Sequence, residues 1–233
     1  MINSKMIFRI LGFLLLIETA MLLCCGAVSL FYKENDLQSF LISSAVTACI
    51  GFLLLAIGKD AVKSLNRRDG YVIVSAAWVT FSLFGMLPYY IGGYIPNVAD
   101  AFFETMSGFS STGATILNNI ESMPHGILFW RAMTQWIGGL GIVFFTIAVL
   151  PIFGVGGIDK VHPRIGITAK WIWGIYAGMT GTLIILLIGG GMSIFDSICH
   201  AFATTSTGGF STKQASIEYY HSPYIDFYGI RHS

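Results

Sequence analysis

Two short clusters of hydroxyl side chains and glycine interrupt the apolar parts of this sequence. They are Ser111-Thr112-Gly113-Ala114-Thr115 and Ser206-Thr207-Gly208-Gly209. Glycine permits backbone conformations that are closed to residues with a Cβ atom, and serine and threonine supply hydroxyl oxygens. The stretches from Ser107 to Asn119 and from Phe202 to Gln214 contain no His, Asp, Glu or Cys, so neither offers a nucleophile with a base or a carboxylate pair. The clusters therefore present neutral oxygen ligands rather than catalytic groups.

The rest of the chain has the composition of a membrane protein. Of its 233 residues, 55% are hydrophobic and 11% are charged, and the mean hydropathy of +0.72 exceeds that of an ordinary water-soluble domain. About 20 helical residues cross a hydrocarbon core of ~30 Å. Five segments are long enough: Ile10–Tyr32, Leu37–Ile57, Tyr71–Ile95, Gly126–Phe153 and Trp171–Met192. We therefore expect an all-α protein in the lipid bilayer, with a sixth apolar segment that begins near Pro223.

Basic residues are distributed unequally between the loops that join these spans. If the N-terminus is cytoplasmic, only Lys33 and Lys213 fall outside, and nine of the thirteen Lys and Arg residues fall inside, as expected of cytoplasmic loops. The nine are Lys5, Arg9, Lys59, Lys63, Arg67, Arg68, Lys160, Arg164 and Lys170. The outer loops would then carry the acidic residues Glu34, Asp36, Asp100, Glu104, Glu121, Asp196 and Glu218. Such an acidic mouth would concentrate cations.

The first span has two interpretations. Lys5 and Arg9 precede an apolar run, as in a cleaved signal peptide that ends near Ala20 or Ala27. Glu18 inside the run, and the length of the run, favour an uncleaved helix in which Glu18 packs as a neutral or hydrogen-bonded group.

One structural unit occurs twice: a span, a short helix, a hydroxyl–glycine loop and the next span. The short helices open at Asn97–Asp100 and Ser193–Asp196, where a capping residue is followed three positions later by a carboxylate, as in a capping box. The segments from Asn97 to Ser110 and from Ser193 to Thr205 have 14 and 13 residues, which gives about 20 Å of helix. They reach only partway through a bilayer, so the chain must dip in and turn back.

A turn at membrane depth constrains its surroundings. Lipid cannot satisfy free backbone N–H and C=O groups, so non-helical backbone survives there only when it is buried in protein or lines a water-filled cavity. Each short helix also directs the negative end of its dipole toward its loop. Carbonyl oxygens, hydroxyls and a negative dipole end suit a dehydrated monovalent cation. Re-entrant turns that merely pack helices through small residues are the alternative.

Four stretches carry a resemblance to a known family. "DAFFETMSGFSSTGATIL", "RAMTQWIGGLGIV", "HPRIGITAKWIWGIY" and "FDSICHAFATTSTGGFSTKQASI" resemble, in order and spacing, the membrane subunit of bacterial Trk-type potassium uptake systems, in the superfamily that also holds Ktr and HKT transporters. The resemblance runs from about Tyr71 to about Pro223. It implies helix–re-entrant loop–helix repeats around a pore: an N-terminal helix pair in residues 1–66, a first repeat in 67–157 and part of a second in 158–233.

The resemblance also implies a site and partners. The two clusters become selectivity filter strands, with potassium bound at Thr112, Gly113, Thr207 and Gly208, and with no cofactor. It implies a multi-pass protein of the bacterial inner membrane that forms a homodimer. A cytosolic nucleotide-binding regulatory subunit would dock on Gly154–Lys170 and Lys59–Asp69. No nucleic acid is expected as a partner.

The sequence departs from the family pattern in length, because the third and fourth repeats do not follow. A fragment, a frameshifted gene or an engineered chain would all look like this. Three functions are compatible with these features: the pore-forming part of a potassium uptake system, a non-transporting remnant of one, and a membrane enzyme acting through the Ser/Thr-rich loops. The lack of catalytic groups in the loops makes the enzyme the weakest hypothesis.

Several single residues have structural interpretations that compete with functional ones. We expect Gly138, Gly139 and Gly141 to pack a helix closely, and Arg131 to snorkel to the interface, with a contact to filter carbonyls as the alternative. Asp196 and His200 lie four apart on a helix, where capping and a local hydrogen bond are favoured over a metal site.

The tryptophans near span ends and the cysteines also have structural interpretations. Trp130, Trp171 and Trp173 flank spans, as interface anchors do. The four cysteines lie in apolar surroundings without metal-ligand spacing, and we expect small core residues without a disulfide: Cys24, Cys25, Cys49 and Cys199.

Overall fold

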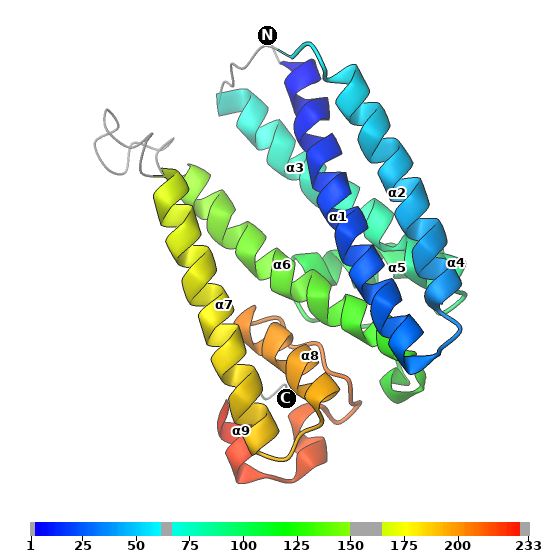
Figure 1. Cartoon of the computed structure of the whole chain (residues 1–233), viewed down its shortest axis with the longest axis vertical. Coiled ribbons are helices and arrows are strands. Elements are labelled where there is room, and N and C mark those ends of the chain that lie inside the picture. Colours follow the sequence, from blue (N-terminus) through cyan, green and yellow to red (C-terminus); the bar gives the residue numbers. More distant parts are fainter. Residues whose placement is uncertain (1–2, 62–66, 150–164, 229–233) are drawn as a thin grey trace. The chain divides into compact units, whose positions relative to one another are not determined.

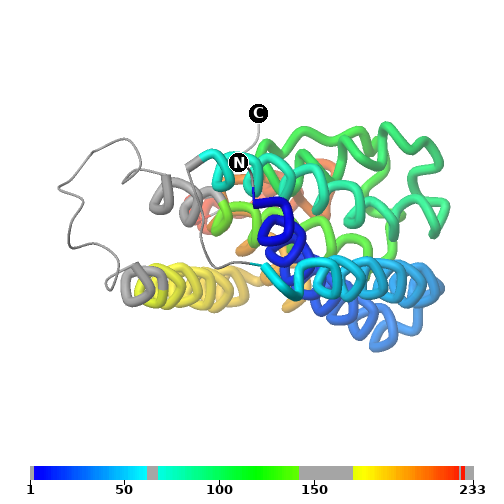
Figure 2. The backbone as a smooth tube through the Cα atoms, turned by 90° about the horizontal axis from the view of Figure 1, so that it is seen from above, coloured from blue at the N-terminus to red at the C-terminus, as the bar shows by residue number. Residues whose placement is uncertain are grey.

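Helices make up every regular element in the described part of the chain, as the computed structural model shows in Figures 1 and 2. The structure describes residues 3–61, 67–149 and 165–228. Its contacts divide the chain into two compact units. Unit 1 comprises Met1–Ser107 and Ser122–Arg131, and unit 2 comprises Gly108–Glu121 and Ala132–Ser233.

Unit 1 contains the N-terminal helices. These are α1 (Ser4–Tyr32), α2 (Leu37–Ile57), α3 (Arg67–Gly85), α4 (Leu87–Ile91), most of α5 (Val98–Phe109) and the first turns of α6 (His125–Val149). α1 packs against both α2 and α3 (Figure 1). The expected span Tyr71–Ile95 is interrupted at Met86, because Pro88 stands in the first turn of α4 and cannot continue the hydrogen bonding of α3.

Four apolar helical stretches in the described residues are long enough to cross a membrane, which confirms the expected class. They are Ser4–Tyr32, Leu37–Ile57, Arg68–Ile91 and Lys170–Gly189.

The contact between α1 and α2 is built from small and hydroxyl-bearing residues. A Cβ atom placed on Gly12 would lie 2.8 Å from the carbonyl oxygen of Gly51, so the two backbones approach closely. Ser43 and Thr47 are buried and donate to carbonyls one turn earlier in α2. Phe52, by contrast, is 62% exposed. Small residues inside and large apolar residues outside are typical of helix pairs in lipid.

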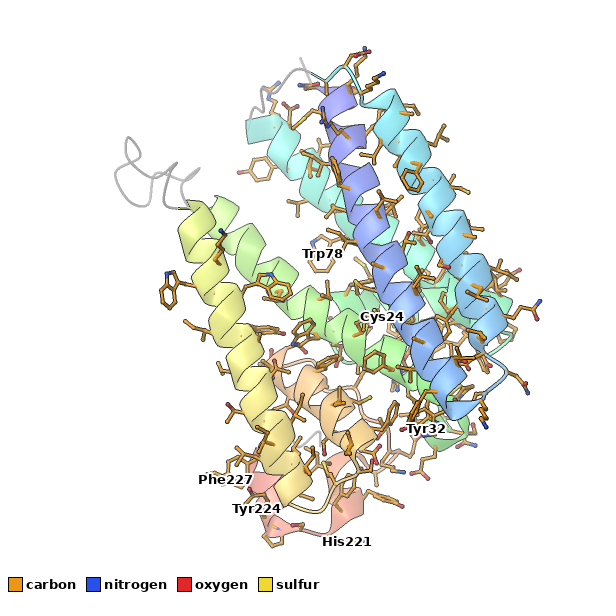
Figure 3. The ribbon with its side chains drawn as sticks, in the orientation of Figure 1. Cys24, Tyr32, Trp78, His221, Tyr224 and Phe227 are labelled. Carbon is orange, nitrogen blue, oxygen red and sulfur yellow. The ribbon has the colours of Figure 1, made fainter. Side chains whose placement is uncertain are left out.

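The loop between α1 and α2 holds the start of α6. Glu34 accepts hydrogen bonds from the backbone N–H of His125 at 2.6 Å and pairs with its ring Nδ1 at 2.8 Å. The same ring stacks on Tyr32, which Figure 3 marks at the end of α1. Asp36 is buried and accepts from Ser29. Two carboxylates that we expected in an open acidic mouth therefore bind within unit 1.

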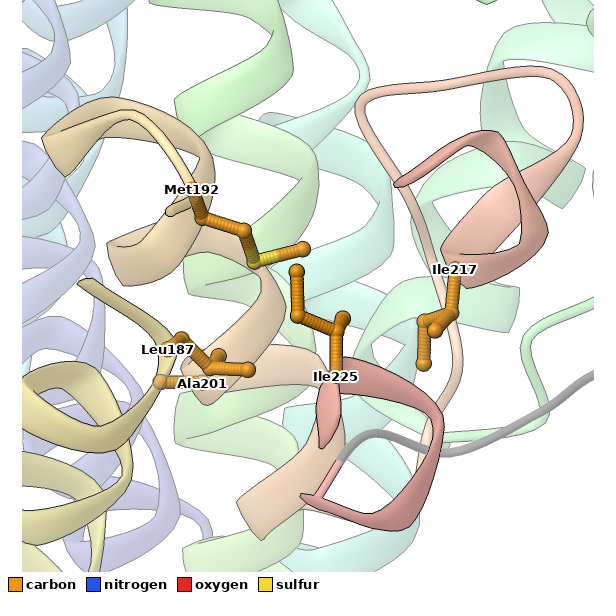
Figure 4. Close-up of a cluster of buried hydrophobic side chains, with 5 residues drawn as sticks. All are labelled: Leu187, Met192, Ala201, Ile217 and Ile225. Carbon is orange, nitrogen blue, oxygen red and sulfur yellow. The ribbon is translucent and has the colours of Figure 1, made fainter. Parts of the chain in front are cut away.

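Unit 2 contains the second half of the repeat pattern. Its elements are the remainder of α6, then α7 (Ile165–Gly189), α8 (Ile194–Thr205), the 3₁₀ turn η4 (Ser216–Tyr220) and α9 (Pro223–Tyr228). α7 packs against α8 and α9. Figure 4 shows the small apolar core that joins them, formed by Leu187, Met192, Ala201, Ile217 and Ile225.

Both short helices form where the sequence predicts them. α5 begins one residue after Asn97, whose side chain accepts from the N–H of Ala99 at 2.9 Å. α8 begins one residue after Ser193, whose hydroxyl accepts from the N–H of Asp196 at 3.1 Å and donates to the Asp196 carboxylate at 2.9 Å. The carboxylate thus binds the capping hydroxyl, rather than the backbone N–H of a standard capping box.

Two expectations for α6 in unit 1 were wrong. Arg131 does not snorkel: it is 1% exposed, and its Nε donates to Glu104 at 2.9 Å. Glu104 is therefore also not part of an acidic mouth. Trp130 is not an interface anchor either, because it is fully buried and donates to the carbonyl of Gly85 at 2.8 Å. The remaining anchors stay predictions: Trp171 is 70% exposed, and Trp173 makes an edge contact with Trp136.

Glu18 in α1 and the four cysteines differ in part from what the sequence predicts. Glu18 is fully buried, and neither of its oxygens has a hydrogen-bond partner among the described residues, where it therefore packs without the hydrogen bond that was one of its expected states. All four cysteines are free thiols in the structure. Cys25 and Cys199 are buried, but Cys24, marked on α1 in Figure 3, and Cys49 are exposed, which corrects their assignment to the core.

The buried ion pair generates a first prediction. Replacing Arg131 with Met, or Glu104 with Gln, should destabilise the protein by about 3–5 kcal/mol, because each change leaves the other charged or polar group buried without its partner. The double variant should lose less than the sum of the two single losses. Thermal unfolding in detergent measures these differences. The exposed Glu218→Gln is the control, and single variants as stable as this control would contradict the prediction.

Candidate functional site

The hydroxyl–glycine loops begin with the same helix ending. After α5 the N–H of Ser111 donates to the carbonyl of Gly108 at 3.0 Å, and after α8 the N–H of Thr207 donates to that of Thr204 at 3.0 Å. The N–H of Gly208 also donates to the carbonyl of Ala203 at 2.9 Å, which completes a Schellman motif on α8.

The residue that closes each helix has an unusual backbone. Ser111 has φ 53° and Thr207 has φ 56°, the left-handed region that glycine usually occupies. A β-branched threonine is especially disfavoured there. Backbone strain of this kind, found at equivalent positions of two loops, is typical of functional sites.

The two loops correspond with an offset that the sequence did not reveal. Gly113 has φ 76° and Gly209 has φ 88°, each two residues after the strained hydroxyl residue. Counted from the helix ends, Gly113 is therefore equivalent to Gly209, whereas sequence comparison paired it with Gly208. In both loops, positive φ occurs at alternate residues.

Backbone atoms of the two loops meet within unit 2. A Cβ atom on Gly113 would lie 1.9 Å from the carbonyl oxygen of Gly208, a separation that no side chain could occupy. Thr112 and Thr207 are exposed, while Gly208 is buried. Neither threonine lies on a helix. The fold thus brings together two loops that are about ninety residues apart in the chain, with hydroxyls exposed beside a shared backbone contact.

The middle of α6 packs closely against the residues at the start of both loops. A Cβ atom on Gly138 would lie 1.9 Å from the carbonyl oxygen of Phe109, and one on Gly139 would lie 2.9 Å from Cβ of Ser206. The close-packing interpretation of these two glycines is therefore confirmed. Larger residues here would push α6 away from the ends of α5 and α8 in unit 2.

One polar residue of α6 was missed by the sequence reasoning. Gln135 is fully buried, and its Oε1 accepts from the backbone N–H of Phe210 at 3.0 Å, directly after the second loop. The hydroxyl of Ser111 donates to the backbone carbonyl of Gln135 at 3.5 Å. A neutral amide within the motif "TQWIGG" gives no charge or metal-ligand spacing that would have singled it out.

A polar network also holds the residues that follow the second loop. Thr212 donates to Asp196 Oδ1 at 2.6 Å, and the two ring nitrogens of His200 lie 2.8 Å from the carbonyl of Asp196 and 3.0 Å from the hydroxyl of Ser211. Because a carbonyl only accepts, Nδ1 carries the hydrogen and Nε2 accepts from Ser211. The expected capping and local hydrogen bond are confirmed, and the described residues hold no cluster of three or more metal-binding side chains.

The protonation states in this network follow from burial and hydrogen bonding. Burial acts to raise the pKa of Asp196, but hydrogen bonds from Thr212 and Ser193 lower it below its ordinary value, so the group is an anion. Burial lowers the pKa of His200, so the imidazole is neutral. The network therefore holds the end of the second loop with a fixed arrangement of donors and acceptors.

A second link joins the loop segments nearer their outer ends. Gln214 Oε1 accepts from the N–H of Ile120 at 3.2 Å, and its own N–H donates to Glu121 at 3.4 Å. Glu121 and Glu218 are exposed, as expected of outer acidic residues.

Comparison with known proteins places the chain among transport proteins. The family model described as "TrkH: Cation transport protein" matches residues 36–232. The potassium uptake protein TrkH of the Trk system from Escherichia coli K12 is 39% identical over 239 residues, and that from Halomonas elongata is 38% identical over 238 residues; each alignment covers 96% of this chain and 49% of the relative.

A solved structure agrees with this match. The crystal structure of the potassium transporter TrkH from Vibrio parahaemolyticus is 36% identical and superposes with a TM-score of 0.89, covering 96% of this chain and 47% of that one. The chain thus spans about half the length of the relatives it matches. The family is one of transporters, not of enzymes, and the apolar helices in the described part of this chain indicate a multi-pass membrane protein. On the extent of the family match and the agreement in fold, the chain belongs to the TrkH family of cation transport proteins.

Proposed function

We propose that this chain supplies the first repeat and part of the second repeat of the pore of a Trk-type potassium uptake system. In this proposal the loops Ser111–Thr115 and Ser206–Gly209 are two of the selectivity filter strands, and potassium is the transported ion, with no cofactor. The observation that carries the proposal is the meeting of the two loops, with Gly113 against the carbonyl of Gly208. Relatives named as Trk system potassium uptake proteins support the choice of ion.

The loop backbone suits a dehydrated cation. A selectivity filter replaces the ion's water shell with rings of carbonyl oxygens. Positive φ at alternate residues of each loop turns over alternate peptide units, which can direct successive carbonyls toward one side. The exposed hydroxyls of Thr112 and Thr207 add further oxygens. The ion sites are proposed at Thr112, Gly113, Thr207 and Gly208, and the equivalence of the loops adds Gly209.

The setting of this pore is also a proposal. We place the chain in the bacterial inner membrane with a cytoplasmic N-terminus, because that orientation leaves most basic residues inside. The name of the relatives supports a multi-component uptake system. A homodimer and a cytosolic nucleotide-binding subunit complete the proposed assembly. Much of the proposed docking surface, residues 62–66 and 154–164, lies outside the described residues.

Growth of a potassium-uptake-deficient bacterium tests the function directly. The 233 residues expressed within a polypeptide of the relatives' full length should restore growth on low-potassium medium. The 233 residues alone should not restore it, because two repeats do not enclose a pore. Failure of the full-length polypeptide to support growth, despite its insertion in the membrane, would contradict the proposal.

Gly113 provides the sharpest test of the filter. In the full-length polypeptide, Gly113→Ser should lower the potassium-over-sodium flux ratio, because its Cβ atom would collide with the carbonyl of Gly208 and force the loops apart. Ion fluxes in proteoliposomes give the ratio. Gly174→Ser on α7 is the matched control, since a Cβ atom there meets nothing within 4 Å. An unchanged ratio in Gly113→Ser would count against the filter assignment.

The strained backbone of Thr207 allows stability and ion selectivity to be tested with one substitution. Thr207→Gly should stabilise the protein by about 1 kcal/mol, because glycine adopts the left-handed conformation without the penalty of a Cβ atom. The same change should reduce the potassium-over-sodium ratio, since it removes an exposed hydroxyl and loosens the loop. Thermal unfolding and ion flux measure the two effects. Thr182→Gly, on the exposed face of α7, is the control and should destabilise its helix. A Thr207→Gly variant that is less stable than the parent would contradict the strain of the Thr207 backbone.

A further inference from the structure

Gln135 lies at the point where both loops and α6 come together in unit 2. Its carboxamide lies against Gly208 so closely that a Cβ atom on that glycine would be 2.5 Å from Cδ, 2.7 Å from Nε2 and 2.8 Å from Oε1. A Cβ atom on Gly113 would lie 3.8 Å from Nε2. One side chain thus contacts the second loop and approaches the first at their mutual contact.

The oxygen and the nitrogen of the Gln135 carboxamide differ in their hydrogen bonding. Oε1 accepts from the N–H of Phe210, so the residue after Gly209 is tied to α6. Nε2 is buried and has no hydrogen-bond partner among the described residues. A buried N–H donor without a partner costs about 1–3 kcal/mol. An apolar side chain of the same size would avoid that cost but would leave the N–H of Phe210 without its acceptor, so the contribution of the amide to the loops lies in its oxygen and its shape.

We propose that Gln135 is a positioning residue that sets the separation of the two filter loops and thereby the discrimination between cations. The inference rests on the proposed function of the loops. Oε1 holds the second loop at Phe210, and the flat face of the carboxamide prevents Gly208 from retreating toward α6. Because Gly113 contacts the carbonyl of Gly208, fixing the second loop also fixes the distance between the two strands. Gln135 itself binds no ion in this scheme.

The chemistry of the side chain makes the proposal specific. Methionine has nearly the length of glutamine but lacks the acceptor for Phe210, whose N–H would then be left buried and unpaired. Glutamate, which a fully buried site favours in its neutral form, keeps both the shape and an oxygen at the position of Oε1. The two replacements therefore separate the filling of space from the hydrogen bond.

The test compares these variants in the full-length polypeptide, reconstituted in proteoliposomes. Gln135→Met should lower the potassium-over-sodium flux ratio by about fivefold, in line with the loss of one hydrogen bond. Gln135→Glu should stay within about twofold of the parent, since it keeps the acceptor. Gln38→Leu, on the exposed surface of α2, is the control for loss of a glutamine amide and should leave the ratio unchanged. If Gln135→Met does not reach the membrane, Gln135→Asn replaces it, because its shorter carboxamide would draw the second loop toward α6 and also lower the ratio.

The outcomes distinguish this inference from the proposed function. A lowered ratio in Gln135→Met, retained in Gln135→Glu, supports the positioning role. An unchanged ratio in Gln135→Met beside a lowered one in Gly113→Ser would overturn the role of Gln135 and leave the filter intact. Equal losses in the Met and Glu variants would also overturn it, since the acceptor would then be irrelevant. Unchanged ratios in both Gly113→Ser and Gln135→Met would reject the filter itself.

Discussion

Backbone groups that are not paired within a helix cannot face hydrocarbon, and this constraint governs the structure around the two hydroxyl–glycine loops. Helices α5 and α8 end after 12 residues each, too early to cross a bilayer, so their loops need a polar or protein-lined environment. The fold supplies it by bringing the loops together, backbone against backbone at Gly113 and Gly208, with α6 behind them. Thr112 and Thr207 remain exposed beside this contact, and in the proposed function their hydroxyls and the loop carbonyls bind a cation without its water.

Close packing and hydrogen bonding contribute separately to holding these loops in place. Glycine allows α6 to approach the ends of both short helices, at Gly138 and Gly139. Polar groups then hold the residues that follow the second loop: Gln135 binds the N–H of Phe210, and the Asp196–His200 network binds the hydroxyls of Ser211 and Thr212. A carbonyl ligand discriminates between ions only if its distance is held, so rigid support is as necessary to the proposed selectivity as the oxygens themselves.

The features that could be predicted from the sequence are local ones. Apolar length predicted four of the five expected spans in the described residues, and the capping residues Asn97 and Ser193 predicted where the short helices begin. Partners that are distant in the chain could not be predicted. Arg131 near a helix end suggests snorkelling unless its partner Glu104, 27 residues earlier, is known to lie beside it. Gln135 looks like any neutral residue until Phe210 is placed next to it, and the equivalence of Gly113 with Gly209 depends on φ angles that sequence comparison cannot see.

The central claim is that the two loops line a path for potassium. Anomalous X-ray scattering from crystals of the full-length polypeptide grown with rubidium, a heavier substitute for potassium, tests it most directly. The account predicts a rubidium peak in contact with backbone oxygens of both loops, near Gly113 and Gly208. Rubidium bound elsewhere on the molecule, with lipid or detergent packed against these loops, would contradict it.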